Sequence, residues 1–68
     1  MQGFIEVTNY ENGKKVLVST LSIISVMYND DGMVFIETWK RGDKVSIGII
    51  VMESYDEIKR KLIRAGLR

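Results

Sequence analysis

The chain has 68 residues, ten of them basic and nine acidic, and it contains no histidine and no cysteine. This composition removes disulfides and the usual zinc ligands as stabilising devices, and the balanced charge gives no strong field to attract a polyanion. A single domain of this size, residues 1–68, buries only about 60% of its unfolded surface. We therefore expect a homo-oligomer, a dimer or larger, because self-association is the stabilising device that remains.

Turn signals divide most of the chain into β-strands. Asn, Asp and Gly residues cluster at 11–14, 30–32 and 41–43, and they separate runs rich in Val, Ile, Phe and Thr. This spacing predicts antiparallel strands at 3–10, 14–19, 23–28, 33–39 and 44–51. The sequence STLS at 19–22 offers no tight turn, so we expect a bend or a short helical turn between the second and third strands.

The first turn predicts the pairing of the first hairpin. Asn12-Gly13 suits a two-residue type I′ turn, which places Val7 opposite Val18 and Thr8 opposite Leu17. One face of this hairpin then holds the apolar side chains of Ile5, Val7, Val16 and Val18.

The second turn predicts a three-residue loop at 30–32, with Gly32 in the left-handed conformation. This loop sets Val26 opposite Ile36, and a two-residue turn would scatter the apolar side chains over both faces. The apolar group expected on one face is Ile24, Val26, Val34 and Ile36.

The third turn, around Gly42, predicts Trp39 opposite Lys44 and Phe35 opposite Gly48. An aromatic ring beside a glycine covers backbone that the glycine leaves bare. In this register the valine-rich face also holds Val34, Ile36, Val45, Ile47, Ile49 and Val51.

The C-terminal segment predicts a helix that begins after Ser54. The sequence SYDE at 54–57 is a capping box, and Gly66 followed by Leu67 is typical of a helix end. Tyr55, Ile58, Leu62 and Ala65 form an apolar stripe that needs a sheet face to cover. The predicted fold is α+β: a five-stranded antiparallel meander, curled or barrel-like, capped by one C-terminal helix.

The opposite face of the predicted sheet is unusually apolar for a surface exposed to water. Such a patch marks a protein interface or a ligand groove. We expect a small, non-enzymatic, self-associating interaction module; a groove for a protein partner or ligand, and an error of register on one strand, are the alternatives. The predicted interface residues are Phe4, Leu17, Met27, Met33, Phe35, Trp39, Ile50 and Met52.

No catalytic, cofactor or metal site is expected. Without His and Cys the chain lacks the commonest general base and the strongest nucleophile, and it contains no Walker, GxSxG or GxGxxG motif. The acidic run at 29–32 lacks the ligand pattern of a calcium loop. The N-terminal MQGFIEV does not resemble a secretory signal, and no stretch approaches the ~20 apolar residues of a membrane span, so a cytoplasmic location is expected.

A nucleic-acid-binding small β-barrel is the main alternative function. Trp39, Lys40, Arg41 and Lys44 combine a stacking group with basic side chains, and Phe35 and Tyr28 would add further stacking groups. The overall charge balance disfavours this alternative. The basic residues near the C-terminus follow acidic ones, as the helix dipole favours, and indicate a solvated helix face.

Several segments of the chain resemble a known family. NGKKVLV, LSIISV, an Ile/Val-rich strand and VMESYDEIKRKL resemble, in this order, small bacterial proteins of the flagellar FlbD type. The most specific matching positions are Val51, Glu53, Ser54, Glu57 and Ile58. The resemblance implies a small accessory or regulatory protein and no transferable site.

Overall fold

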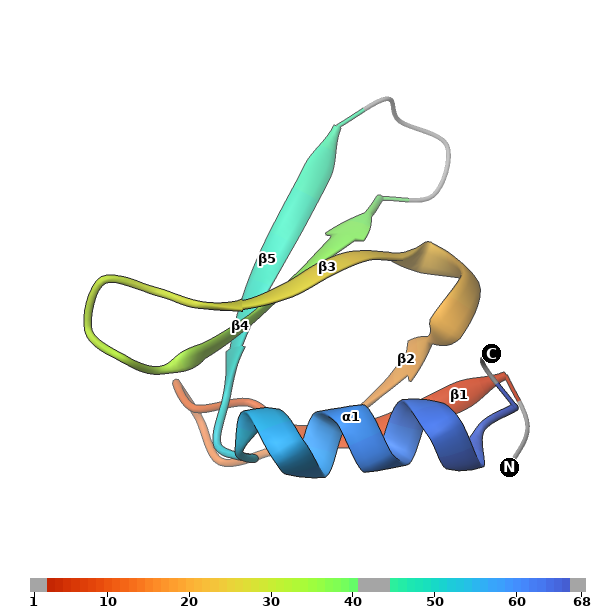
Figure 1. Ribbon diagram of the computed structural model, residues 1–68. Coiled ribbons are helices and arrows are strands. Elements are labelled where there is room, and N and C mark those ends of the chain that lie inside the picture. The colour runs from red at the N-terminus through yellow and green to blue at the C-terminus, as the bar shows by residue number, and fades with distance from the viewer. Residues whose placement is uncertain (1–2, 41–44, 67–68) are drawn as a thin grey trace.

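The computed structural model describes residues 3–40 and 45–66 and has an α+β fold, as the sequence predicts (Figure 1). Five antiparallel strands are followed by one helix, and each strand lies within two residues of its predicted bounds. The elements are β1 (Phe4–Thr8), β2 (Lys15–Ser19), the short 3₁₀ helix η1 (Thr20–Ser22), β3 (Ile23–Tyr28), β4 (Val34–Trp39), β5 (Ser46–Val51) and α1 (Tyr55–Arg64).

The strands form two sheets rather than the single meander that the sequence predicted. β1 pairs with β2, and β3, β4 and β5 form the second sheet in that order. The prediction of a short helical turn at STLS is confirmed: η1 turns the chain away from β2, and the Ser22 hydroxyl donates to the Ser19 carbonyl at 2.8 Å. Because β3 leaves β2 at this turn, the two strands do not pair.

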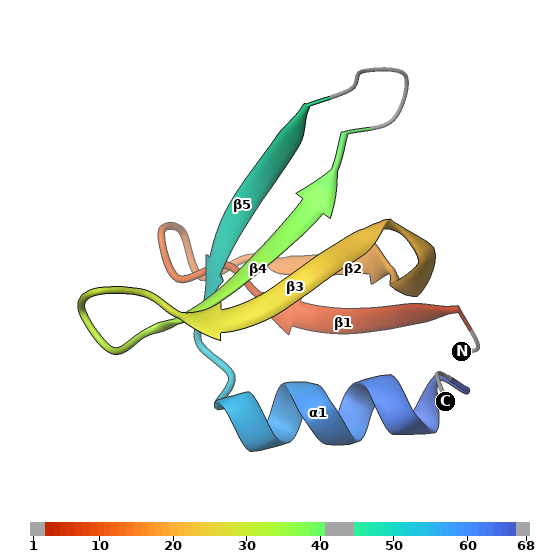
Figure 2. The same ribbon diagram turned by 45° about the horizontal axis from the view of Figure 1, so that its top comes forward.

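The two sheets meet at an isolated bridge between Asn9 and Val51. The Tyr10 amide donates to the Ile50 carbonyl, and the Met52 amide donates to the Thr8 carbonyl, both at 2.9 Å. Beyond this junction β1 and β5 diverge, and the sheets are not closed (Figure 2). The expectation of a curled or barrel-like sheet was therefore wrong.

The predicted pairing of the first hairpin is wrong by two residues. Val7 lies opposite Val16 instead of Val18, and Thr8 lies opposite Lys15 instead of Leu17. A type I′ turn needs positive φ at both central residues, and in this loop only Gly13 has it, with φ 71°. The loop therefore spans residues 10–13. Because a shift of two residues preserves the faces, the four apolar side chains still share one face.

The predicted second hairpin is confirmed at its turn. Gly32 has φ 79°, and Val26 lies opposite Ile36. A register shift between Ile23 and Ser25 changes which side chains face the core at the N-terminal end of β3. Ile23 consequently packs against the core, and Ile24 is 40% exposed. The prediction that Ile24 belongs to the core face was wrong.

The predicted third hairpin is also wrong by two residues. Trp39 lies opposite Ser46 rather than Lys44, which is outside the described residues, and Ile36 lies opposite Ile49. This register brings Val51, 3% exposed, directly opposite Val34, 5% exposed, so core packing favours it. The predicted faces are retained, but the β1–β2 sheet does not extend over the start of β5. Val45 and Ile47 therefore remain 54% and 53% exposed.

Helix α1 closes one side of the core and lies alongside β1 (Figure 2). The predicted capping box is confirmed: the Glu57 amide donates to the Ser54 hydroxyl at 3.2 Å, and the Ser54 amide donates to the Glu57 carboxylate at 3.3 Å. Gly66, with φ 87°, ends the helix as predicted, and Leu67 lies outside the described residues. The buried core is Ile5, Val7, Val18, Val34, Ile36, Val51 and Ile58.

Candidate functional site: the free edge of β5

The structure distributes the eight predicted interface residues over more than one surface. Cross-strand pairing aligns Met27, Phe35 and Ile50 in one row on the outer face of the three-stranded sheet. Trp39 lies farther along β4 and is 53% exposed. Phe4 and Leu17 belong to the β1–β2 sheet, and Met33 and Met52 line a pocket at the end of the molecule.

A polar cluster interrupts the outer face between Phe35 and Trp39. The Glu37 carboxylate accepts hydrogen bonds from the Ser25 hydroxyl at 3.2 Å and from the Ser46 hydroxyl at 3.0 Å. These bonds link β3, β4 and β5 through one side chain. The outer face is therefore apolar at one end and polar in its middle.

Among the described residues, no strand lies beside one edge of β5 at the N-terminal end of this strand. Backbone groups of alternate residues point to opposite neighbours in an antiparallel ladder. The Lys40 amide donates to the Val45 carbonyl at 3.1 Å, so the backbone groups of residue 45 point toward β4. By alternation, the backbone groups of residues 47 and 49 also point toward β4. The backbone groups of Ser46 and Gly48 consequently point away from β4. Within residues 3–40 and 45–66, no strand pairs with them on that side.

This free edge carries no charged side chain. Residues 45–52 read VSIGIIVM, and the sequence has no proline at all. Exposed edge strands are usually protected by Lys, by Pro or by a bulge, because their unpaired amides and carbonyls template another strand. None of these protections is present between Ser46 and Val51. The projecting end of β4 and β5 leaves this edge open in both views (Figures 1 and 2).

The edge lies between two hollows, one on each face of the sheet. On the outer face, a hollow of about 600 Å³ is lined by Phe35, Ile50 and the first hairpin loop. On the inner face, a hollow of about 250 Å³ is lined by Ile47, Thr38 and residues of β2. Gly48 lines both hollows. A strand added at such an edge places alternate side chains on opposite faces, and each face here has room for them.

The residues of the nucleic-acid alternative are not gathered in one place. Trp39 and Phe35 share the outer face, with the carboxylate of Glu37 between them. Tyr28 pairs with the buried Val34, and its ring stacks on Tyr55 with the centroids 5.6 Å apart. Tyr28 is therefore on the helix side of the sheet. Arg41 and Lys44 lie outside the described residues.

The pKa of Glu53 is lowered from its ordinary value of 4.5. Burial raises this pKa, but hydrogen bonds from the Thr8 amide at 2.8 Å and the Thr8 hydroxyl at 2.9 Å outweigh that effect and lower it. The bonds tie the segment before α1 to the end of β1. Glu53 is therefore a charged structural group.

Among the residues that the structure describes, no group of three or more acids is arranged to hold a metal ion. The described part of the chain also has no helix long and apolar enough to cross a membrane. Glu6 lies in the β1–β2 sheet and Glu37 in the other sheet.

Sequence reasoning missed two features of the surface. The free edge of β5 depends on which strands become neighbours, and no local pattern encodes that order. A pocket lined by Tyr10, Tyr28 and Tyr55 was also missed, because its residues come from a loop, a strand and a helix. The only available signal was that the chain has three tyrosines.

Comparisons with protein-family models, with curated proteins and with solved structures find no match to this chain. The resemblance to FlbD-type proteins stays a prediction. Its most specific segment forms the junction between β5 and α1.

Proposed function

We propose that this protein is a non-enzymatic, cytoplasmic interaction module that self-associates through the free edge of β5. The observation that carries the proposal is the unpaired, uncharged edge at Ser46 and Gly48, with a hollow on each face. Main-chain hydrogen bonds supply affinity in strand addition, and side-chain pockets supply specificity. An accessory role of this kind agrees with what the FlbD-type resemblance implies.

The proposed occupant of the edge is β5 of a second copy, antiparallel and related by a two-fold axis. Centred on Ile47, this pairing lets the Gly48 amide of each copy donate to the Ser46 carbonyl of the other. Ile47 then faces Ile47 of the partner subunit, and Val45 faces Ile49 of the partner subunit. These contacts would cover Val45 and Ile47, which are 54% and 53% exposed.

Three properties favour a second copy over a foreign strand. β5 is itself an apolar, uncharged strand of the kind that this edge accommodates. The net charge of +1 causes little repulsion between copies. The seven buried apolar residues form a small core, and a domain of this size gains stability from association.

The test substitutes Ile47 with Lys and measures the mass by sedimentation equilibrium at micromolar to high micromolar concentrations. A lysine at the centre of the paired edge places two like charges opposite each other, so the variant should be monomeric. The matched control is Leu21→Lys, which adds the same charge at a side chain that is 90% exposed on η1. The control should keep the oligomeric mass of the wild type.

Both variants should retain the fold, because Ile47 is 53% exposed and lies outside the core, and circular dichroism checks this. A wild-type protein that remains a folded monomer at high micromolar concentration would contradict the proposed function. Loss of association in Leu21→Lys but not in Ile47→Lys would place the interface elsewhere.

The nucleic-acid alternative retains one favourable observation, the half-exposed Trp39 beside Lys40. The carboxylate of Glu37 on the same face opposes it, because it repels phosphates. Titration of single-stranded oligonucleotides at low salt, followed by Trp39 fluorescence, tests this alternative. Our proposal predicts no quenching; quenching that disappears at higher salt would favour nucleic acid as the partner.

A further inference from the structure

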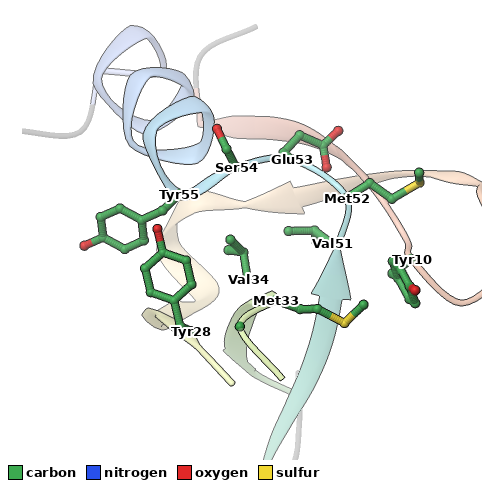
Figure 3. A pocket seen from close by; sticks show the side chains of 10 residues that line it. Tyr10, Tyr28, Met33, Val34, Val51, Met52, Glu53, Ser54 and Tyr55 are labelled. Carbon is green, nitrogen blue, oxygen red and sulfur yellow. The ribbon is translucent and has the colours of Figure 1, made fainter. Parts of the chain in front are cut away.

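A second site does not include Ser46 or Ile47 of the β5 edge: all three tyrosines of the chain line one pocket of about 320 Å³ (Figure 3). The buried side chains of Val34 and Val51 lie at its base. In Figure 3, Tyr28 and Tyr55 stand together on one side, and Tyr10 stands on the other. The thioethers of Met33 and Met52 complete the apolar lining.

The three tyrosines are held in place while their rings remain accessible. Tyr28 and Tyr55 stack with an interplanar angle of 23°, and the capping box fixes the start of the helix that carries Tyr55. The Tyr10 amide donates to the Ile50 carbonyl, which anchors the loop residue to β5. The residues Tyr28, Tyr10 and Tyr55 are nevertheless 60%, 54% and 37% exposed.

The pocket has negative charge and no positive charge in its lining. Glu53 lines it, and no Lys or Arg among the described residues does. The negative charge of Glu53, with no described basic side chain in the lining, favours a cationic ligand.

The carboxylate of Glu53 and the hydroxyl of Ser54 in the lining already have hydrogen-bond partners. Both carboxylate oxygens of Glu53 accept hydrogen bonds from Thr8, and the Ser54 hydroxyl accepts the helix-capping bond. A primary ammonium needs several strong acceptors when it leaves water. A methylated ammonium has fewer N–H groups or none, and it is attracted to aromatic faces.

We propose that this pocket binds an organic cation that carries a methylated ammonium group. The tyrosine rings supply cation–π attraction, the valine and methionine side chains contact the methyl groups, and Glu53 supplies the counter-charge. Two sources share this chemistry, a free quaternary ammonium compound and a trimethylated lysine side chain. The proposal does not depend on self-association, because neither Ser46 nor Ile47 lines the pocket.

The test titrates the wild-type protein with choline and follows the methyl signals of Met33 and Met52 and the tyrosine ring signals by NMR. The paired probe is 3,3-dimethyl-1-butanol, which has the shape of choline without its charge. We expect choline to shift the signals of the pocket residues and to bind at least about 5-fold more tightly than the neutral probe. Equal binding of the two probes, or no shift with millimolar choline, would overturn the proposal.

Substitutions then identify the groups responsible. Tyr28→Leu should weaken choline binding about 5- to 30-fold, whereas Tyr28→Phe, which keeps the aromatic face, should retain it within about 2-fold. Leu21→Ala is the control outside the pocket and should bind like the wild type. Equal loss of binding in the Leu and Phe variants would contradict the role of the ring face.

A peptide with trimethyllysine provides the last comparison. Tighter binding of this peptide than of choline would assign the cation to a protein partner, and the reverse order would assign it to a free small molecule. Binding of the unmethylated peptide as tightly as the methylated one would contradict the proposed selectivity.

Discussion

The ring of Phe35 lies directly against the backbone of Gly48 on the neighbouring strand. The two residues are diagonal neighbours, because Phe35 is paired with Ile50 and Gly48 with Glu37. A Cβ atom at position 48 would overlap the tip of the ring. The glycine therefore allows the aromatic side chain to cover the outer face beside the free edge of β5.

Gly48→Ala should destabilise the protein by about 1–3 kcal/mol, because the added methyl group displaces the Phe35 ring. In a Phe35→Ala background the conflict is absent, and alanine is favoured over glycine in a strand by about 0.5–1 kcal/mol. The same substitution should then stabilise the protein. Urea unfolding of the four proteins in this double-mutant cycle measures the change of sign, and equal effects of Gly48→Ala in both backgrounds would contradict the contact.

Gly32→Ala tests the second hairpin. Gly32 has φ 79°, and a side chain in the left-handed conformation costs about 1–2 kcal/mol. The free energy of unfolding should fall by that amount. The control, Asp31→Ala, changes an exposed side chain in the same loop and should stay within about 0.5 kcal/mol of the wild type. A Gly32 variant as stable as the control would argue against the three-residue loop.

Ser54→Ala should lower the free energy of unfolding by about 1 kcal/mol, since it removes the side-chain acceptor of the Glu57 amide. Ser54→Thr retains a hydroxyl and should recover most of this loss. Thermal or urea unfolding of the three proteins makes the comparison. Identical losses in the Ala and Thr variants would show that the cap contributes little.

The hydrogen bonds between Thr8 and Glu53 predict a dependence of stability on pH. The pKa of Glu53 is lowered from 4.5 in the folded protein, so its stabilising contribution is fully present above about pH 4.5 and declines as the pH falls through the folded pKa. The wild type should exceed Glu53→Gln in stability at neutral pH, and the difference should shrink in acid.

Urea unfolding at several pH values measures this difference. Glu11→Gln, which removes an exposed carboxylate on the first hairpin loop, is the control and should follow the wild type at every pH. A gap between wild type and Glu53→Gln that is as large in acid as at neutral pH would contradict a charge-dependent role for Glu53.

Local features of this fold could be predicted from sequence because few residues decide them. The capping box at Ser54 and Glu57 and the left-handed Gly32 depend only on neighbours along the chain. The registers of the first and third hairpins were wrong by two residues, because a shift of two residues leaves every side chain on its face. The hydrophobic pattern cannot distinguish two registers that differ by two residues, and core packing, as between Val34 and Val51, selects one of them.

The candidate sites depend on long-range neighbours. Thr8 and Glu53 are 45 residues apart in sequence, and their contact follows from the junction of β1 with β5. The predicted apolar outer face was divided because β2 and β3 do not pair. Sequence patterning therefore predicted that apolar side chains remain exposed, but the strand order determines which edge they flank.

Amide hydrogen exchange at Gly48 tests the proposed self-association most directly. In a single copy this amide points away from β4, and no strand of the described residues pairs with it, so it should exchange rapidly. Pairing of two β5 strands predicts that the Gly48 amide becomes protected as protein concentration rises, and that Ile47→Lys abolishes this protection. Rapid exchange of Gly48 at every concentration, in a sample whose core amides are protected, would contradict association through this edge.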